Sequence, residues 1–156
     1  ETMEIAAELM RKGIDGNEII DKTYYEKTYV QNQILGRALL ESMLILDKRC
    51  IVSVIRKKSM EFFQAKPSDL EGIVSQLRLT KGVEVAMFLH ETEAQKFKVS
   101  LRSKGKVDVS RIAQYFGGGG HVRAAGVTMQ GSSHDVINNI TEQIAEQLDK
   151  GAAEEV

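Results

Sequence analysis

The residues best suited to do chemistry lie together in residues 116–126, around four consecutive glycines. Gly117–Gly120 carry no side chains, can adopt positive φ angles and leave their N–H groups approachable, so these groups can curl into a concave anion-binding nest. His121 and Arg123 follow at once and add an imidazole and a guanidinium as hydrogen-bond donors. The pattern indicates a site for an anionic group. A flexible linker is the alternative, although linkers usually carry Ser or charged residues.

Two familiar phosphate-binding motifs do not fit this segment. Walker A requires Gly-Lys-Ser/Thr at its end, whereas Gly120 is followed by His121, and the dinucleotide fingerprint requires a small residue where Arg123 stands. The glycines also follow an apolar-faced helical stretch, so the helix dipole there opposes an anion. Anion binding therefore has to come from the backbone and from side-chain cations.

The elements that must position this segment follow from hydrophobic periodicity. Helical spacing fills the first 45 residues and returns at 70–81, 109–116 and 133–148, where Asp108 or Ser110 and Ser132 or Ser133 can cap the last two helices. Short β-branched or alternating stretches at 51–55, 83–89, 97–102 and 125–129 predict strands, with a hairpin turn at 91–95. We predict an α/β fold: a mixed β-sheet flanked by helices, preceded by a helical arm. The expected units are residues 1–46, 47–150 and a flexible tail at 151–156.

Composition limits the partners and the compartment. The 156 residues carry 21 basic and 22 acidic side chains and a formal net charge of −1, which argues against coating nucleic acid by charge alone. A single cysteine, Cys50, excludes an intramolecular disulfide and fits a reducing compartment. No run of about 18 apolar residues and no signal peptide is visible, so we expect a cytoplasmic protein without membrane contact from this chain.

The glycine segment also supports a family assignment. Gly118-Gly-Gly-His121 followed by Ala124-Ala-Gly126 resembles the signature of the DHH-associated domain, the C-terminal partner of the DHH phosphoesterase domain. The stretches 99–103 (Val-Ser-Leu-Arg-Ser) and 107–110 (Val-Asp-Val-Ser) resemble that family in the same order. The chain is most similar to the nano-RNase and adenosine 3′,5′-bisphosphate phosphatase subgroup. The resemblance implies that residues 47–150 bind short single-stranded oligonucleotides or nucleotide phosphates, and that residues 1–46 connect them to an N-terminal, manganese-dependent catalytic DHH domain.

The resemblance also implies which residues contact the substrate. Arg102 suits a phosphate because its planar guanidinium can hold two oxygens at once, and His121 can donate a hydrogen bond. For Arg123 a solvent-exposed side chain remains as plausible as a phosphate contact. The expected substrate-binding residues are Arg102, Ser103, Gly118, Gly119, Gly120, His121 and Arg123.

The family's Asp-His-His motif is absent from the chain, and its aspartates are scattered rather than clustered at ligand spacing. We therefore expect no catalytic residue, metal or cofactor in this chain, which alone would be inactive, and a hydrolase in the full-length protein. His90, Glu91 and Glu93 at the expected hairpin tip are better explained as solvated side chains than as a metal site, and Lys98 as an ordinary sheet residue.

Three alternatives stay open at this stage. Related phosphodiesterases of cyclic dinucleotides carry a similar Gly-Gly-Gly-His segment. The C-terminal region of alanyl-tRNA synthetases, a non-enzymatic tRNA-binding and dimerisation module, is distantly similar, although tRNA binding favours a basic surface. A plain homodimerisation domain is the third alternative.

Overall fold

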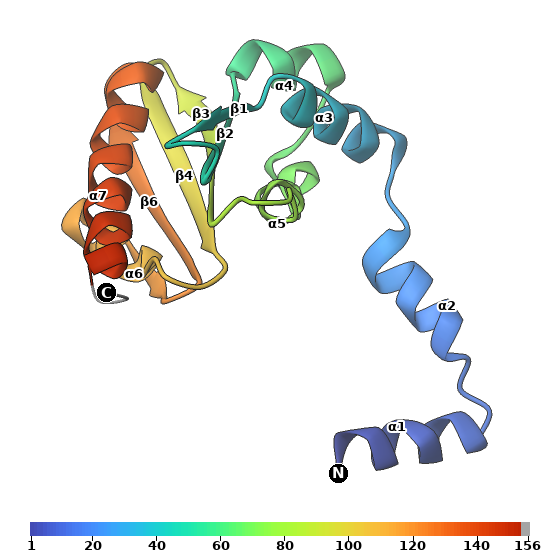
Figure 1. Ribbon diagram of the computed structural model, residues 1–156. Helices are drawn as coiled ribbons and strands as arrows, with labels where there is room; N and C mark the ends of the chain where they lie inside the picture. The colour runs from blue at the N-terminus through green and yellow to red at the C-terminus, as the bar shows by residue number, and fades with distance from the viewer. Residues whose placement is uncertain (154–156) are drawn as a thin grey trace.

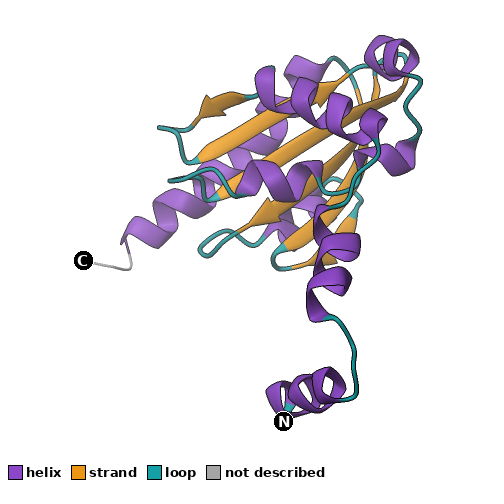
Figure 2. Cartoon of the chain, turned by 90° about the vertical axis from the view of Figure 1, so that its right-hand side faces the viewer, coloured by secondary structure: helices purple, strands orange, loops and turns teal. Residues whose placement is uncertain are grey.

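The computed structural model describes residues 1–153, with side chains as far as Asp149. Helices cover both faces of one sheet in the body of the molecule, and an N-terminal helical arm extends away from it (Figures 1 and 2). This architecture confirms the predicted α/β class with a mixed sheet.

The sheet contains one parallel strand pair among antiparallel ones. Within residues 1–153 its order is β1-β2-β3-β4-β6-β5, and only β2 and β3 run parallel. The crossover between those two carries helices, as parallel strands require. The strands are β1 (Met43–Ile45), β2 (Cys50–Ile55), β3 (Val85–Glu93), β4 (Lys96–Ser103), β5 (Gly119–His121) and β6 (Ala124–Gln130).

The helices form the arm and two layers. The arm consists of α1 (Thr2–Arg11), α2 (Gly16–Ile20) and the π-helical turn η1 (Asp21–Tyr25). One layer contains α3 (Tyr29–Leu40), α4 (Lys57–Phe63), the 3₁₀ turn η2 (Pro67–Leu70) and α5 (Ile73–Arg78). The other contains α6 (Val109–Tyr115) and α7 (Ser133–Ala153). Asp108 and Ser132 cap these helices: the Asp108 side chain accepts from the Ser110 N–H, and the Ser132 side chain accepts from the Asp135 N–H.

The two layers cover the sheet unequally. On one face α6 and α7 pack against all four long strands, with Leu101 and Val127 among the buried residues. On the other face the α3–α5 layer forms a separate core with β2 and β3, and Phe88 of β3 is one of its buried residues. Burial of apolar area stabilises each core by roughly 25 cal/mol per Å². The core of that second layer includes no residue of β4, β6 or β5, although α5 borders β4 (Figure 1).

Three helices differ from the sequence-based prediction. The third helix ends at Leu40 rather than running on through Met43, because Met43–Ile45 pairs with the edge of β2 as β1. The helix expected over residues 70–81 is divided at Gly72, which has φ = 84°. Helix α4 was not predicted, because its first turn is charged and Met60 is its single buried residue, too few to give an apolar pattern.

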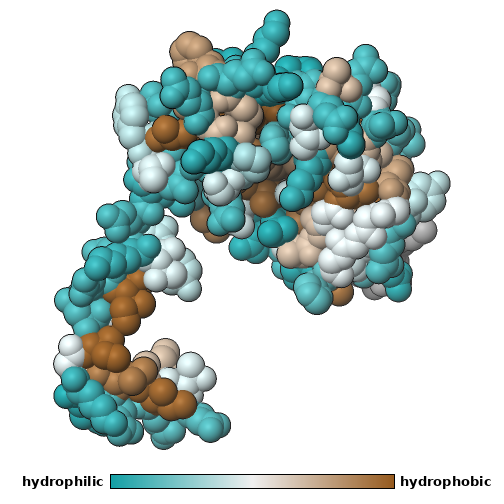
Figure 3. Space-filling model, turned by 180° about the vertical axis from the view of Figure 1, so that it is seen from behind, coloured by the Kyte–Doolittle hydropathy of each residue, from teal (hydrophilic) through white to brown (hydrophobic). Residues whose placement is uncertain are grey.

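The arm contributes no buried residue in α1, α2 or η1. Its apolar side chains gather on one side, visible as a continuous hydrophobic strip in Figure 3. The exposed apolar side chains of α1 and α2 are those of Met3, Ile5, Leu9, Met10, Ile19 and Ile20. An amphipathic helix of this kind normally buries such a face.

At the other terminus, α7 continues through Ala153, so residues 151–153 of the expected tail are helical. Residues 154–156 lie outside the described part of the chain. None of the described helices is long and apolar enough to cross a bilayer.

The glycine run forms a strand rather than an anion-binding nest. Gly117, with φ = 82°, ends the segment after α6, and Gly119–His121 then pairs with β6 as the outer strand β5. A β-carbon on Gly118 would lie 2.3 Å from the Gly126 carbonyl oxygen, and one on Gly120 would lie 2.5 Å from the Ala124 carbonyl oxygen. A β-carbon on Gly119 would meet nothing within 4 Å. Packing therefore requires glycine at Gly118 and Gly120 but leaves room for a side chain at Gly119.

We predict that Gly118→Ala and Gly120→Ala each lower the free energy of unfolding by about 1–3 kcal/mol, the cost typical of forced overpacking. Gly119→Ala, the matched control, leaves it within about 0.5 kcal/mol, as for a surface position with free space. Urea titration followed by circular dichroism measures all three. Equal destabilisation by the three substitutions would contradict the difference in packing.

Candidate functional site

The predicted site residues Arg102 and His121 lie in one row across the sheet. Arg102 of β4 pairs with Ala124 of β6, and Ala124 pairs with His121 of β5. Directly paired residues point to the same face, and strands are about 4.8 Å apart, so the two backbones are about 10 Å apart. The guanidinium and the imidazole therefore project from the same face, the one that the α3–α5 layer leaves uncovered.

The neighbouring row on this face is almost bare of side chains. Ser100 pairs with Gly126, and Gly126 pairs with Gly119. Gly119 is exposed and has open space in front of its Cα. A ligand can consequently reach the backbone of β6 and β5 here, beside the cations of the first row.

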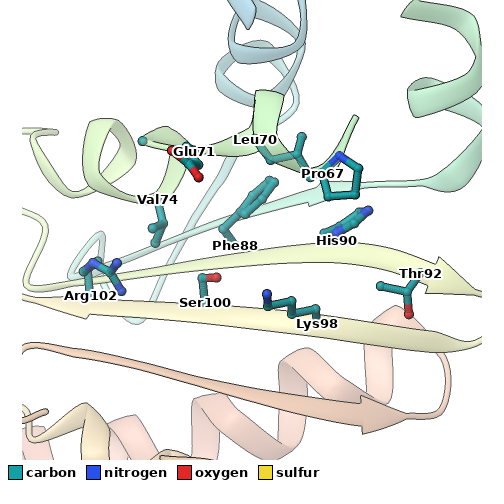
Figure 4. Close-up of a pocket in the computed structure, with 11 residues that line it drawn as sticks. Pro67, Leu70, Glu71, Val74, Phe88, His90, Thr92, Lys98, Ser100 and Arg102 are labelled. Carbon is teal, nitrogen blue, oxygen red and sulfur yellow. The ribbon is translucent and has the colours of Figure 1, made fainter. Parts of the chain in front are cut away.

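A groove of about 440 Å³ runs along the covered edge of this face, between β4 and the α3–α5 layer (Figure 4). Leu70 and Val74 line it from η2 and α5, and Phe88 from β3. The polar side comes from β4, which contributes Lys98, Ser100 and Arg102. Gly119 and His121 are not among the groove's lining residues; they lie on the open continuation of the same sheet face.

Arg102 is positively charged, half-buried and free of carboxylate partners. One of its Nη atoms donates to the carbonyl of Leu101 at 2.9 Å, and no ion pair joins it to any acidic residue in the described part of the chain. Burial, followed by the nearby charge of Arg78, lowers the pKa of Arg102. Most of its five N–H donors therefore remain available for an anion.

Two further groove residues were underestimated from the sequence. His90 lies within β3 rather than at a hairpin tip, because the strands extend to Glu93 and from Lys96, and it pairs with Lys98 of β4. Both side chains line the groove (Figure 4). Burial, and then the charge of Lys98, lowers the pKa of His90. The even spacing of Lys98, Ser100 and Arg102 places Lys98 on the same strand face from the sequence alone, but it does not show that η2 and α5 form a groove over that face.

Ser103 faces away from the groove. Its side chain is fully buried on the opposite side of β4 from Arg102, and its hydroxyl donates to the Val122 carbonyl at 3.3 Å. The Ser103 N–H donates to the Arg123 carbonyl, and the Val109 N–H also donates to Val122. Ser103 thus supports the turn after His121, and its hydroxyl lies on the opposite side of β4 from the groove.

Arg123 and His121 are both exposed. The Arg123 guanidinium donates a short hydrogen bond to the Gly105 carbonyl, which ties the β5–β6 turn to the loop after β4. Within the described part of the chain no hydrogen bond anchors the His121 side chain in this way, so its imidazole can turn toward a ligand on the open face.

Metal ligands are not grouped in this part of the protein. Among the described residues no three His, Cys, Asp or Glu side chains are placed to hold a metal ion. Glu91 instead accepts from the Lys57 N–H, and Glu93 pairs with Lys96. Of the three residues His90, Glu91 and Glu93, the two carboxylates therefore have partners within the protein. The residues present do not fit a manganese site.

Comparison with known proteins agrees with the motif-based assignment. Residues 47–150 match the family described as the DHHA1 domain. The chain is 29% identical over 150 residues to the bifunctional oligoribonuclease and PAP phosphatase NrnA of Thermus thermophilus, covering 95% of this chain and 44% of that protein. It is 22% identical to a membrane protein–large ribosomal subunit bL9 fusion protein of the Aster yellows witches'-broom phytoplasma, covering 88% of this chain and 15% of that protein.

Solved structures show the same fold. An exopolyphosphatase-related protein from Bacteroides fragilis superposes with a TM-score of 0.84 at 27% identity, over 93% of this chain and 43% of that one. A pGpG-specific phosphodiesterase from Vibrio cholerae superposes with a TM-score of 0.53 at 11% identity, over 74% of this chain and 39% of that one. The chain spans less than half the length of each of these relatives. The family match covers about two thirds of the chain, and the chain therefore belongs to the DHHA1 domain family.

Proposed function

We propose that this domain grips the phosphate and sugar of a short single-stranded oligonucleotide or a nucleotide phosphate on the open half of its sheet. The observation that carries the proposal is the shared row of Arg102, Ala124 and His121 beside the bare row of Ser100, Gly126 and Gly119. A guanidinium without a carboxylate partner, an exposed imidazole and an approachable backbone together suit a phosphate ester.

Each site residue has a part in this proposal. Arg102 holds phosphate oxygens through the N–H groups of its planar guanidinium, and His121 donates a hydrogen bond to the same ligand. Gly119 lets the sugar approach the backbone, while Gly118 and Gly120 keep β5 close against β6. Ser103 and Arg123 act indirectly, by fixing the turn after His121.

We propose further that the domain is part of a larger phosphoesterase. The Thermus thermophilus relative is named for both oligoribonuclease and phosphatase activities, and this chain covers 44% of that relative. A catalytic DHH domain with manganese, located N-terminal to the arm, would supply bond cleavage and cover the exposed apolar strip of α1 and α2. The buried, free thiol of Cys50, whose pKa burial raises to about 12, fits the reducing cytoplasm.

In this arrangement the domain contributes orientation. Holding the phosphate and sugar against a rigid sheet removes translational and rotational freedom before the reaction, which lowers the barrier without any proton transfer by this chain. Residues Arg102 and His121 bind and position, and the reacting groups come from the catalytic domain.

We predict that Arg102→Ala weakens binding of a 5′-phosphorylated diribonucleotide by about 1.5–3 kcal/mol, roughly 10- to 150-fold in dissociation constant, because a charged hydrogen bond is lost. Isothermal titration calorimetry of the 156-residue chain measures the affinity. Arg111→Ala is the control: that side chain is 82% exposed on α6, behind the sheet, and its loss should leave the affinity unchanged.

Two further ligands separate the alternatives in the same titration. Preference for tRNA over the diribonucleotide would favour a tRNA-binding module, and preference for a cyclic dinucleotide would favour the cyclic dinucleotide phosphodiesterases. Unchanged diribonucleotide affinity in Arg102→Ala would remove Arg102 from the site.

We also predict that Gly119→Ala weakens binding of the diribonucleotide at least about fivefold while the fold stays intact, because the new methyl group occupies the bare strip where the ligand must approach. Fluorescence anisotropy with a labelled diribonucleotide measures the change. Thr128→Ala, on the same strand face near the far end of β6, is the control with unchanged affinity. Wild-type affinity in Gly119→Ala would exclude close approach at β5.

The isolated chain is predicted not to hydrolyse a diribonucleotide with Mn²⁺ present, since its described residues offer no group of metal ligands. Ion-exchange chromatography of the products after prolonged incubation checks this. Metal-dependent release of mononucleotides that scales with chain concentration would overturn the division of labour between the two domains.

A further inference from the structure

A single carboxylate oxygen holds the loop that follows β4. Oε1 of Glu84 accepts hydrogen bonds from the N–H groups of Gly105, Lys106 and Val107, at 2.8, 2.5 and 3.3 Å respectively. Successive N–H groups that converge on one point form an anion-binding nest, and here the protein's own side chain occupies it. The nest expected in the glycine run is therefore found in this loop instead, already filled.

The backbone of Glu84 is fixed by the sheet. Its N–H donates to the Arg49 carbonyl at 2.7 Å, and its carbonyl accepts from the Lys104 N–H at 2.9 Å. The residue directly precedes β3, whose first residue, Val85, is fully buried and pairs with Ser103 of β4. The carboxylate is thus held by the end of the sheet and in turn holds a loop that lies outside it.

The loop passes this anchorage on to the turn that carries His121. Gly105 contacts Glu84 through its N–H, and its carbonyl accepts the short hydrogen bond from the Arg123 guanidinium. Arg123 lies in the turn directly after His121, between β5 and β6. A continuous series of contacts therefore runs from the Glu84 carboxylate to the backbone that carries the imidazole.

The position of His121 depends on such an anchor. Strand β5 is three residues long and exposed throughout. Within the described residues, no hydrogen bond holds the imidazole itself. Its direction is therefore set by the backbone at the turn. Hydrogen bonds to a carboxylate are stronger than those between neutral groups, so several of them at one oxygen restrain the loop firmly.

We propose that Glu84 is a positioning residue for nucleotide binding, which acts on His121 without touching the ligand. Its carboxylate fills the nest and holds Gly105, and Gly105 holds Arg123 in the turn. The inference rests on the proposed function, in which the imidazole donates a hydrogen bond to the phosphate ester. Loss of the carboxylate leaves the nest without an acceptor, so the loop loosens and the turn moves with it.

The test is a double-mutant cycle on the affinity for the 5′-phosphorylated diribonucleotide, measured with the 156-residue chain. We expect Glu84→Ala to weaken binding about five- to tenfold, comparable to the loss of one hydrogen bond from His121. In the His121→Ala background the same substitution should change the affinity less than about 1.5-fold, because the group that it positions is already gone. In the Arg102→Ala background it should still weaken binding by its full factor.

Formate gives a second readout, because this small carboxylate can enter the nest that Glu84→Ala leaves empty. Sodium formate should restore most of the lost affinity of that variant, compared with sodium chloride at the same concentration, and should not raise the affinity of the wild-type chain. Glu84→Gln, which keeps a side-chain oxygen at the same reach but loses the charge, should bind within about threefold of wild type.

Glu91→Ala is the matched control. Glu91 lies at the other end of β3, and its carboxylate also accepts from a backbone N–H, that of Lys57, at 3.1 Å. Lys57 begins α4, which belongs to the layer over β2 and β3. Removal of this carboxylate should leave the diribonucleotide affinity unchanged.

Arg123→Ala carries the test if Glu84→Ala fails to fold. Arg123 is exposed, and its substitution breaks the series of contacts after Gly105 while the filled nest stays intact. It should weaken binding by the same factor as Glu84→Ala, and it should have no further effect in the His121→Ala background. Wild-type affinity in a folded Arg123→Ala chain would overturn the inference.

The outcomes separate the inference from the function on which it rests. Wild-type affinity in Glu84→Ala, an equal loss with and without His121, or a loss that formate does not reverse overturns the role of Glu84 and leaves the proposed function standing. Failure of the wild-type chain to bind the diribonucleotide overturns the proposed function, and the positioning role with it.

Discussion

The close contact between β5 and β6 is the constraint on which the rest of the site depends. Gly118 and Gly120 lie so near the backbone of β6 that a single added carbon at either would overlap it. This approach places His121 opposite Ala124, and so in line with Arg102. A bulkier residue at either glycine would push the outer strand away and would separate the imidazole from the guanidinium. The glycines thus determine where the cations stand before they affect any ligand.

The site also depends on where the helix layer ends. Twelve buried residues join α3–α5 to β2 and β3, and each large one contributes about 1.5–3 kcal/mol. Because this core ends at β3, β4 forms one wall of the groove and the same sheet face continues openly over β6 and β5. A chain of net charge −1 thereby displays the local cations Lys98 and Arg102 beside an accessible sheet face.

The sequence allowed the fold class, the positions of the long strands along the chain and the β3–β4 hairpin to be anticipated, because apolar periodicity is a local signal. The common row of Arg102 and His121 depends on the pairing of β6 with both β4 and β5, which no local signal gives. The strand at Gly119–His121 could not be predicted from propensity, since glycine is depleted in strands and only the contact with β6 holds it extended. Strand alternation places Ser103 on the same face as Phe97, Val99 and Leu101, so its burial could have been predicted from spacing alone.

The sheet ends in a three-residue strand on each side, β1 at one edge and β5 at the other. Strands of this length offer too few free backbone groups to recruit another chain, a device by which β proteins avoid edge-to-edge polymerisation. Copies of this protein are therefore poorly equipped to join sheet to sheet into a continuous ribbon. Self-association would have to use surfaces other than the edge strands, and the amphipathic helices α1 and α2 offer an exposed apolar surface.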